Sequence, residues 1–180
     1  MALAEESGDD WWLVVVAHIN VEMARINEEY ERANSLYDES MELSQRLGYE
    51  GSVATECFNK SFVALASGDL DQALLLLQNH FQIRDKLDEG GLDPLGLIAV
   101  VSYLTARDDI ENTAEAAFLC RRLLGAKNIV PDPADEAPLK SAETLIQESL
   151  TQETLAQLES RSLLVNCRDL VERHIGARQI

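Results

Sequence analysis

Stretches of this chain repeat at a fixed spacing of 40 residues. Residues 30–47 align with residues 70–87, and Ile110 continues the series begun by Tyr30 and Leu70. Other aligned pairs are similar in character: Ala33 with Ala73, Leu36 with Leu76, Met41 with Phe81, and Leu47 with Leu87. A period between about 20 and 50 residues with helical patterning is typical of stacked helix pairs. The repeat therefore predicts an all-α solenoid and favours binding over catalysis.

Periodicity and stop signals predict three helix pairs in the repeated part. Gly48 and the Ser-Gly-Asp turn at residues 67–69 suit helix ends, and Pro94 suits a first helical turn. We expect helices at residues 10–26, 28–47, 52–66, 70–87, 94–106 and 111–124.

The pattern changes after residue 130. Residues 130–135 form a Pro- and Asp-rich connection, and three shorter helices are expected off the 40-residue period. Their expected ranges are 137–147, 153–160 and 164–175. Because terminal elements of a solenoid cap an exposed core face, they are often atypical. We therefore expect one domain, with helix pairs in residues 1–130 and C-terminal capping helices in residues 131–180.

The chain starts in the middle of a repeat. Ser7-Gly8 aligns with Leu47-Gly48, so residues 2–8 match the last turns of the second helix of a pair. This alignment predicts a truncated repeat and a chain cut from a longer solenoid. A natural small protein with a frayed start is the alternative.

The charge of the chain restricts its partners. The sequence has 15 lysine and arginine residues against 32 aspartate and glutamate residues, a net charge of −17. Direct nucleic-acid binding is disfavoured, because contact with phosphates needs a basic surface. The charge either serves solubility alone or attracts a basic partner segment.

Cysteine usage and the N-terminus indicate the compartment. Cys57, Cys120 and Cys167 are far apart, which suits buried thiols in a reducing environment. The acidic N-terminus lacks the hydrophobic core of a signal peptide. The apolar run at residues 11–17 is far shorter than the roughly 20 residues that span a bilayer. We expect a soluble, cytoplasmic protein without membrane contact.

The repeat units resemble a known family. The resemblance is carried by residues 8–12, 29–33, 36–40 and 46–48 of the first unit and by residues 64–73 of the second, whereas residues 109–114 of the third are degenerate. These segments resemble tetratricopeptide-type (TPR-like) repeats. They are most similar to the 40-residue variety at the C-terminal end of large bacterial transcriptional and signalling regulators. There the repeats share a chain with an NTPase module and a DNA-binding or cyclase module.

This resemblance implies a right-handed α-solenoid that acts as a protein-interaction or sensor-regulatory domain. The implied partner is a protein or peptide segment, or another domain of the same parent chain. The chain departs from the family at Asn20, Lys60 and Val100, where leucine is usual, and at Val21, Ser61 and Val101, where glycine is frequent. We expect the stem of Lys60 to lie along the apolar surface and Asn20 to bond a neighbouring carbonyl.

No catalytic, metal or phosphate-binding motif occurs in the sequence. His18, His80 and His174 share no metal-ligand spacing. We therefore expect no catalytic residues, no metal site and no cofactor. His18 and Glu22, one helical turn apart, form the only acid/base pair that the spacing offers.

In TPR-like stacks, the first helices of the pairs line a concave groove, and residues spaced by three and four share one stripe. The expected core stripe is Ala17, Val21, Ala24, Cys57, Ser61, Ala64, Leu97, Val101 and Leu104. The expected partner-binding stripe is Val15, His18, Glu22, Arg25, Thr55, Phe58, Phe62, Leu65, Leu95, Ile98, Ser102 and Thr105.

Phe58 and Phe62 are the expected anchors for an amphipathic helix or an extended peptide. In one alternative, the capping helices fill this groove. In the other, the groove binds a small molecule, and the chain is then a sensor or, as a less favoured hypothesis, an enzyme. Trp11 and Trp12 open the first unit. We expect at least one to pack in the core, while an exposed one would allow a homodimer through the N-terminal face.

Overall fold

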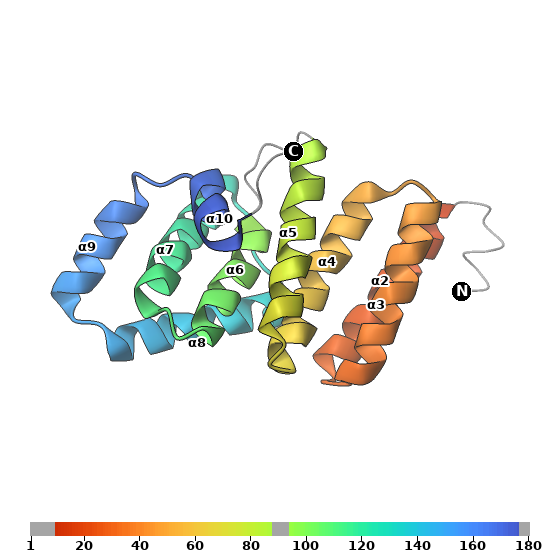
Figure 1. Ribbon diagram of the computed structural model, residues 1–180, viewed down its shortest axis with the longest axis horizontal. Helices are drawn as coiled ribbons and strands as arrows, with labels where there is room; N and C mark the ends of the chain where they lie inside the picture. Colours follow the sequence, from red (N-terminus) through yellow and green to blue (C-terminus); the bar gives the residue numbers. More distant parts are fainter. Residues whose placement is uncertain (1–9, 88–93, 177–180) are drawn as a thin grey trace.

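The computed structural model describes residues 10–87 and 94–176, and in these ranges it contains helices and no strands. Successive helices pack side by side along an elongated molecule (Figure 1). The helices are α2 (Asp10–Ile26), α3 (Tyr30–Arg46), α4 (Glu50–Ala66), α5 (Leu70–Lys86), α6 (Pro94–Ala106), α7 (Ile110–Lys127), α8 (Pro133–Ser149), α9 (Gln152–Ser162) and α10 (Cys167–Ile175). The truncated repeat predicted at residues 2–8 lies outside the described residues.

The predicted bounds are confirmed for α2 and α6 and differ at the ends of the other helices. The predicted first residues of α8 and α10 were wrong, and a side-chain cap explains each difference. Helix α8 begins at Pro133 because the Asp132 side chain accepts bonds from the amides of Ala134 and Asp135, at 2.8 and 2.9 Å. Helix α10 begins at Cys167, three residues after the predicted start, because the Asn166 side chain accepts a bond from the amide of Asp169 at 2.9 Å and caps the helix there. Side-chain caps of this kind define a helix start more sharply than apolar periodicity does.

The turn inside each helix pair repeats at the 40-residue spacing. Glu28, Gly68 and Asp108 all have left-handed backbone, with φ of 60°, 74° and 56°. In each turn, the amide of this residue bonds the carbonyl three residues earlier at 3.0 Å, and the next amide bonds the carbonyl five residues earlier at 2.9–3.1 Å. This bond pair is the Schellman motif, which ends a helix and satisfies its last carbonyls. The predicted helix start at residue 28 was therefore wrong, because Glu28 lies in the turn between α2 and α3.

The turns that follow the second helix of a pair also repeat. Gly48 and Asn128, two periods apart, have φ of 79° and 52° and make the same bond pair. The backbone repeat therefore extends through the third pair, where the similarity of the sequence fades.

The core runs along the stack. Eight of the nine expected core-stripe residues are buried, and Ala17 is the partly exposed one. A small cluster of Val21, Ala24, Ala33, Tyr37 and Val63 joins the first pair to α4. A larger cluster continues from α4 to α10.

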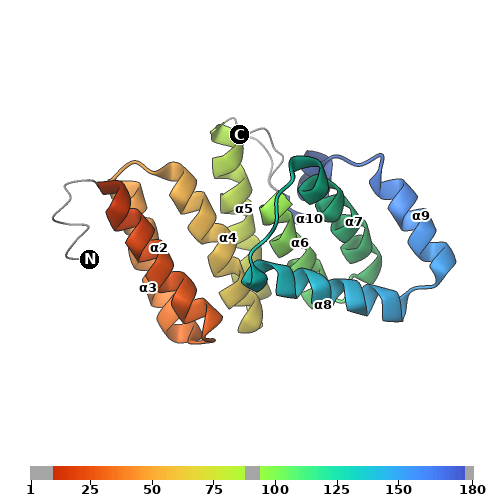
Figure 2. The same ribbon diagram turned by 180° about the vertical axis from the view of Figure 1, so that it is seen from behind.

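The closing helices pack on the last pair. Helix α8 lies across α6 and α7, α9 packs on α7, and α10 reaches α5 and α6 (Figure 2). Glu115 of α7 is fully buried, and its carboxylate accepts bonds from Arg161 of α9 and Arg173 of α10, all at 2.9 Å. A buried carboxylate needs such partners, so this contact fixes both closing helices. No helix in the described ranges combines the length and apolar character needed to cross a membrane.

Replacing Glu28 by glycine should raise the free energy of unfolding by about 1 kcal/mol, because a left-handed conformation strains any residue with a Cβ. Gly68→Ala is the matched opposite change. A Cβ at Gly68 meets nothing within 4 Å, so only backbone strain acts, and stability should fall by about 1 kcal/mol. Urea unfolding followed by circular dichroism measures both effects. Loss of stability in both variants would contradict the assigned turn.

Candidate functional site

The residues predicted to line the groove lie on α2, α4 and α6, and they differ in exposure. Arg25, Phe58 and Ile98 are buried. The remaining ones are partly exposed: Val15, His18, Glu22, Thr55, Phe62, Leu65, Leu95, Ser102 and Thr105. Ile98 is on α6, the helix that α8 packs against, whereas the other predicted groove residues of this unit stay partly exposed. The partly exposed surface on α2 and α4, which we call the A-face, is the candidate site.

Arg25 is the centre of the A-face. Its guanidinium bonds Glu22 Oε2 through Nε at 3.0 Å and through Nη2 at 2.5 Å, and it reaches Asp135 Oδ1 of α8 at 3.2 Å. It also lies over the ring of Phe62, 5.4 Å from the ring centre. The Tyr37 hydroxyl donates a bond of 2.5 Å to Glu22. One side chain thereby connects α2, α4 and α8, which are far apart in sequence.

The two carboxylates that contact Arg25, those of Glu22 and Asp135, differ in how strongly they hold it. Burial raises the pKa of Asp135 to about 6, although Arg25 acts in the opposite direction. Glu22 is the closer partner of Arg25 and has the support of Tyr37. The guanidinium is therefore held chiefly by Glu22, and the bond to Asp135 ties the start of α8 to this pair.

His18 has a partner that the sequence did not indicate. Its Nδ1 lies 3.2 and 3.3 Å from the two carboxylate oxygens of Glu56 on α4. Glu56 is buried and also accepts a bond of 2.7 Å from the Ser40 hydroxyl. The hydrogen bond to Glu56 raises the pKa of His18. The expected acid/base pair of His18 with Glu22 is thus wrong, because each side chain is bonded elsewhere.

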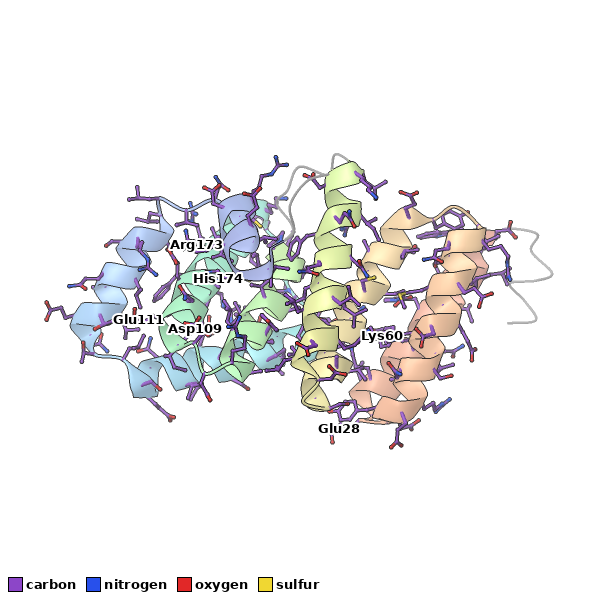
Figure 3. The ribbon with its side chains drawn as sticks, in the orientation of Figure 1. Glu28, Lys60, Asp109, Glu111, Arg173 and His174 are labelled. Carbon is purple, nitrogen blue, oxygen red and sulfur yellow. The ribbon has the colours of Figure 1, made fainter. Side chains whose placement is uncertain are left out.

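Lys60 lies on the other side of α4, between α3 and α5 (Figure 3). It is buried, and its Nζ contacts Asp38 Oδ1 of α3 at 2.5 Å. Its stem lies beside apolar side chains such as Val53 and Leu76, and its ammonium is paired with this carboxylate. Asn20, expected to bond a carbonyl, is exposed.

A cavity of about 550 Å³ opens beside Lys60. Amide, acidic and apolar side chains line it together: Asp38, Met41, Glu42, Gln45, Val53, Cys57, Gln72, Leu76, Asn79, Gln82 and Ile83. Burial raises the pKa of the Cys57 thiol to about 11, which keeps it neutral and a poor nucleophile. The cavity therefore combines a paired lysine with an unreactive thiol, which is not a nucleophilic centre.

The tryptophans are less buried than expected. Trp11 packs edge-on against the ring of Tyr49, with ring centres 5.3 Å apart. Even so, Trp11 and Trp12 remain 46% and 52% exposed. Neither is enclosed in the core; among the described helices, α2 packs on α3 and, to a smaller extent, on α4.

These features define an all-α protein of consecutively packed helix pairs with a charged, aromatic surface on its first helices. In the part of the chain that the structure describes, no group of three metal-ligating side chains comes together. Comparison with protein-family models, curated proteins and solved structures gave no match.

The bond between His18 and Glu56 predicts a pH-dependent stability. The folded state holds the proton of His18 more tightly than the unfolded chain does. The pKa of His18 in the unfolded chain is 6.5, so the stabilisation is complete below this pH. It is lost as the pH rises through the raised pKa of the folded state. His18→Gln should lower the unfolding free energy by about 0.5–1 kcal/mol at acidic pH and by less at alkaline pH.

Urea unfolding of the wild type and His18→Gln over a pH series measures this difference. The same series in a Glu56→Gln background is the control, because the pH-dependent part should vanish without the carboxylate. A difference that stays constant across the series would contradict the pairing.

Proposed function

We propose that this chain is a protein-interaction and sensor-regulatory module built as a right-handed, TPR-like α-solenoid, and that it is not an enzyme. Its partner is a protein or peptide segment, and its place of action is the cytoplasm. The A-face is the proposed contact surface. The regulatory part of the proposal depends on the resemblance of the repeats to those of large regulators.

The placement of Arg25 over Phe62 carries the proposal. Arginine and aromatic side chains contribute most to the energy of protein interfaces. Phe62 is partly exposed, stacks edge-on with Phe58 at 5.3 Å between ring centres, and is followed one turn later by the partly exposed Leu65. A partner side chain placed on Phe62 and Leu65 would gain apolar contact next to the guanidinium that Glu22 and Asp135 hold in place.

The A-face is also fixed before any partner arrives. Glu22, Tyr37 and Asp135 hold the guanidinium of Arg25, and Phe58 supports the ring of Phe62 from the core. A side chain that is already ordered loses little entropy on binding, and this improves affinity. The arrangement suits a binding surface better than a reactive centre, because each charged group already has a partner.

The chemistry of the partner follows from charge and shape. A surface with apolar residues from two adjacent helices suits an amphipathic helix or an extended segment. The net charge of −17 attracts basic sequences and repels acidic ones. We therefore propose an apolar segment flanked by lysine or arginine, and binding that weakens as salt is added.

The contact between Arg25 and Asp135 supports a regulatory role. It connects the A-face directly to α8, which covers α6 and α7. A partner that drew Arg25 away from Asp135 would release the start of α8. Such a change requires that the partner bind the two arrangements with different affinity.

Affinity capture from an extract tests the A-face. Phe62→Ala should reduce recovery of the partner more than tenfold, because truncation of such an anchor costs about 2 kcal/mol or more. Leu75→Ala is the matched control, since Leu75 is a half-exposed leucine on α5. Circular dichroism confirms that both variants fold.

The proposal is supported if the wild type and Leu75→Ala hold the same partners, if added salt releases these partners, and if Phe62→Ala does not hold them. Equal recovery with all three proteins would contradict the assigned surface.

A further inference from the structure

The outer side of α2 carries an apolar stripe that no described helix covers. Trp12, Ile19, Met23 and Ile26 are 52%, 53%, 54% and 55% exposed. With the partly buried Val16, they follow one another at spacings of four and three residues. This heptad spacing keeps all five on one side of the helix and is the spacing of helix-to-helix seams. We call these five residues the α2 stripe.

The repeat shows what kind of structure covers this side of a first helix. In α4 and α6 the equivalents of Val16, Ile19 and Met23 are all buried. They are Glu56, Asn59 and Val63 in α4, and Gly96, Ala99 and Tyr103 in α6.

The covering structure is the preceding helix in both cases. Glu56 is bonded to Ser40 of α3. A Cβ at Gly96 would lie only 2.5 Å from the ring of His80 on α5. A helix therefore covers this side in the second and third units, and a helix is the occupant that suits the α2 stripe.

The charge pattern points to the same surface. The chain carries a net charge of −17, yet α2 contains only three charged residues. Two of these, Glu22 and Arg25, bond each other on the inner side of the helix. Asp10 at the start of α2 is the third, so the stripe itself is uncharged. Two copies can approach through this face without the repulsion that acts over the rest of the surface.

We propose that the α2 stripe is the contact of a symmetric homodimer, in which α2 packs antiparallel against α2 of a second copy. Ile19 is the middle member of the stripe, and Trp12 and Ile26 lie seven residues before and after it. A two-fold axis near Ile19 therefore places each stripe on the other and covers both at once. Closed two-fold dimers are the commonest protein oligomers.

The area predicts a reversible dimer. Half of a large side chain is about 100 Å², so the four half-exposed residues of the stripe together offer roughly 400 Å² in each copy. The total of about 800 Å² is below the size of stable interfaces and is typical of weak, transient contacts. Dissociation on dilution is therefore expected.

Sedimentation equilibrium of the full chain tests the proposal. The wild type should change from monomer to twice the 20.0 kDa monomer mass as concentration rises. Ile19→Glu should weaken the dimer by at least about 100-fold, because it places two carboxylates in an apolar contact. Leu75→Glu, a half-exposed leucine on α5, should leave it unchanged.

Fluorescence gives a second reading. The chain contains two tryptophans; Trp12 belongs to the stripe and Trp11 is next to it in the sequence, so dilution should shift the emission to longer wavelength. The emission of Ile19→Glu should be independent of concentration. Circular dichroism establishes that the variant is folded.

Three outcomes would overturn the proposal. These are a wild type that stays monomeric at high concentration, a dimer that Ile19→Glu leaves intact, or a series of larger species, which would indicate head-to-tail stacking instead. None of them bears on the A-face, because capture by that surface is measured separately with Phe62→Ala.

Discussion

A left-handed residue between the two helices of each pair determines how those helices meet, and the rest of the architecture depends on it. Glu28, Gly68 and Asp108 follow the first helix with left-handed backbone and the same two backbone bonds, so the chain turns into each second helix in the same way. Only glycine adopts this conformation without strain. The first and third turns keep it with acidic residues, which indicates that the packed helix pairs enforce the turn.

Buried charged side chains on the first helices of the pairs connect these helices to their neighbours. Arg25 connects α2 to α8 through Asp135, and Glu56 connects α4 to α2 and α3 through His18 and Ser40. Such groups destabilise the fold when a partner is missing, because an uncompensated buried charge is costly. They therefore fix one arrangement of the helices, and they place Phe62 beneath an ordered guanidinium on the A-face.

The helices and the core stripe could be predicted from the sequence, because apolar periodicity and the 40-residue spacing are local signals. The pairing of side chains could not. His18 was matched with Glu22 by spacing along one helix, whereas its partner Glu56 comes from the neighbouring repeat. Phe58 and Ile98 were predicted to line the groove but are buried, because Phe58 packs against His80 of α5 and Ile98 lies on α6, against which α8 packs. The α2 stripe is readable from sequence as a heptad, but its exposure follows only from the packing.

Backbone NMR of the unmodified chain tests the central claim, that one turn geometry recurs every 40 residues. Chemical shifts and three-bond couplings report the sign of φ for each residue, including the acidic ones. The account predicts positive φ at Glu28, Gly68 and Asp108, with helical shifts on both sides of each. Negative φ at Glu28 and Asp108, or helical shifts that continue through residues 26–30 or 106–110, would contradict it.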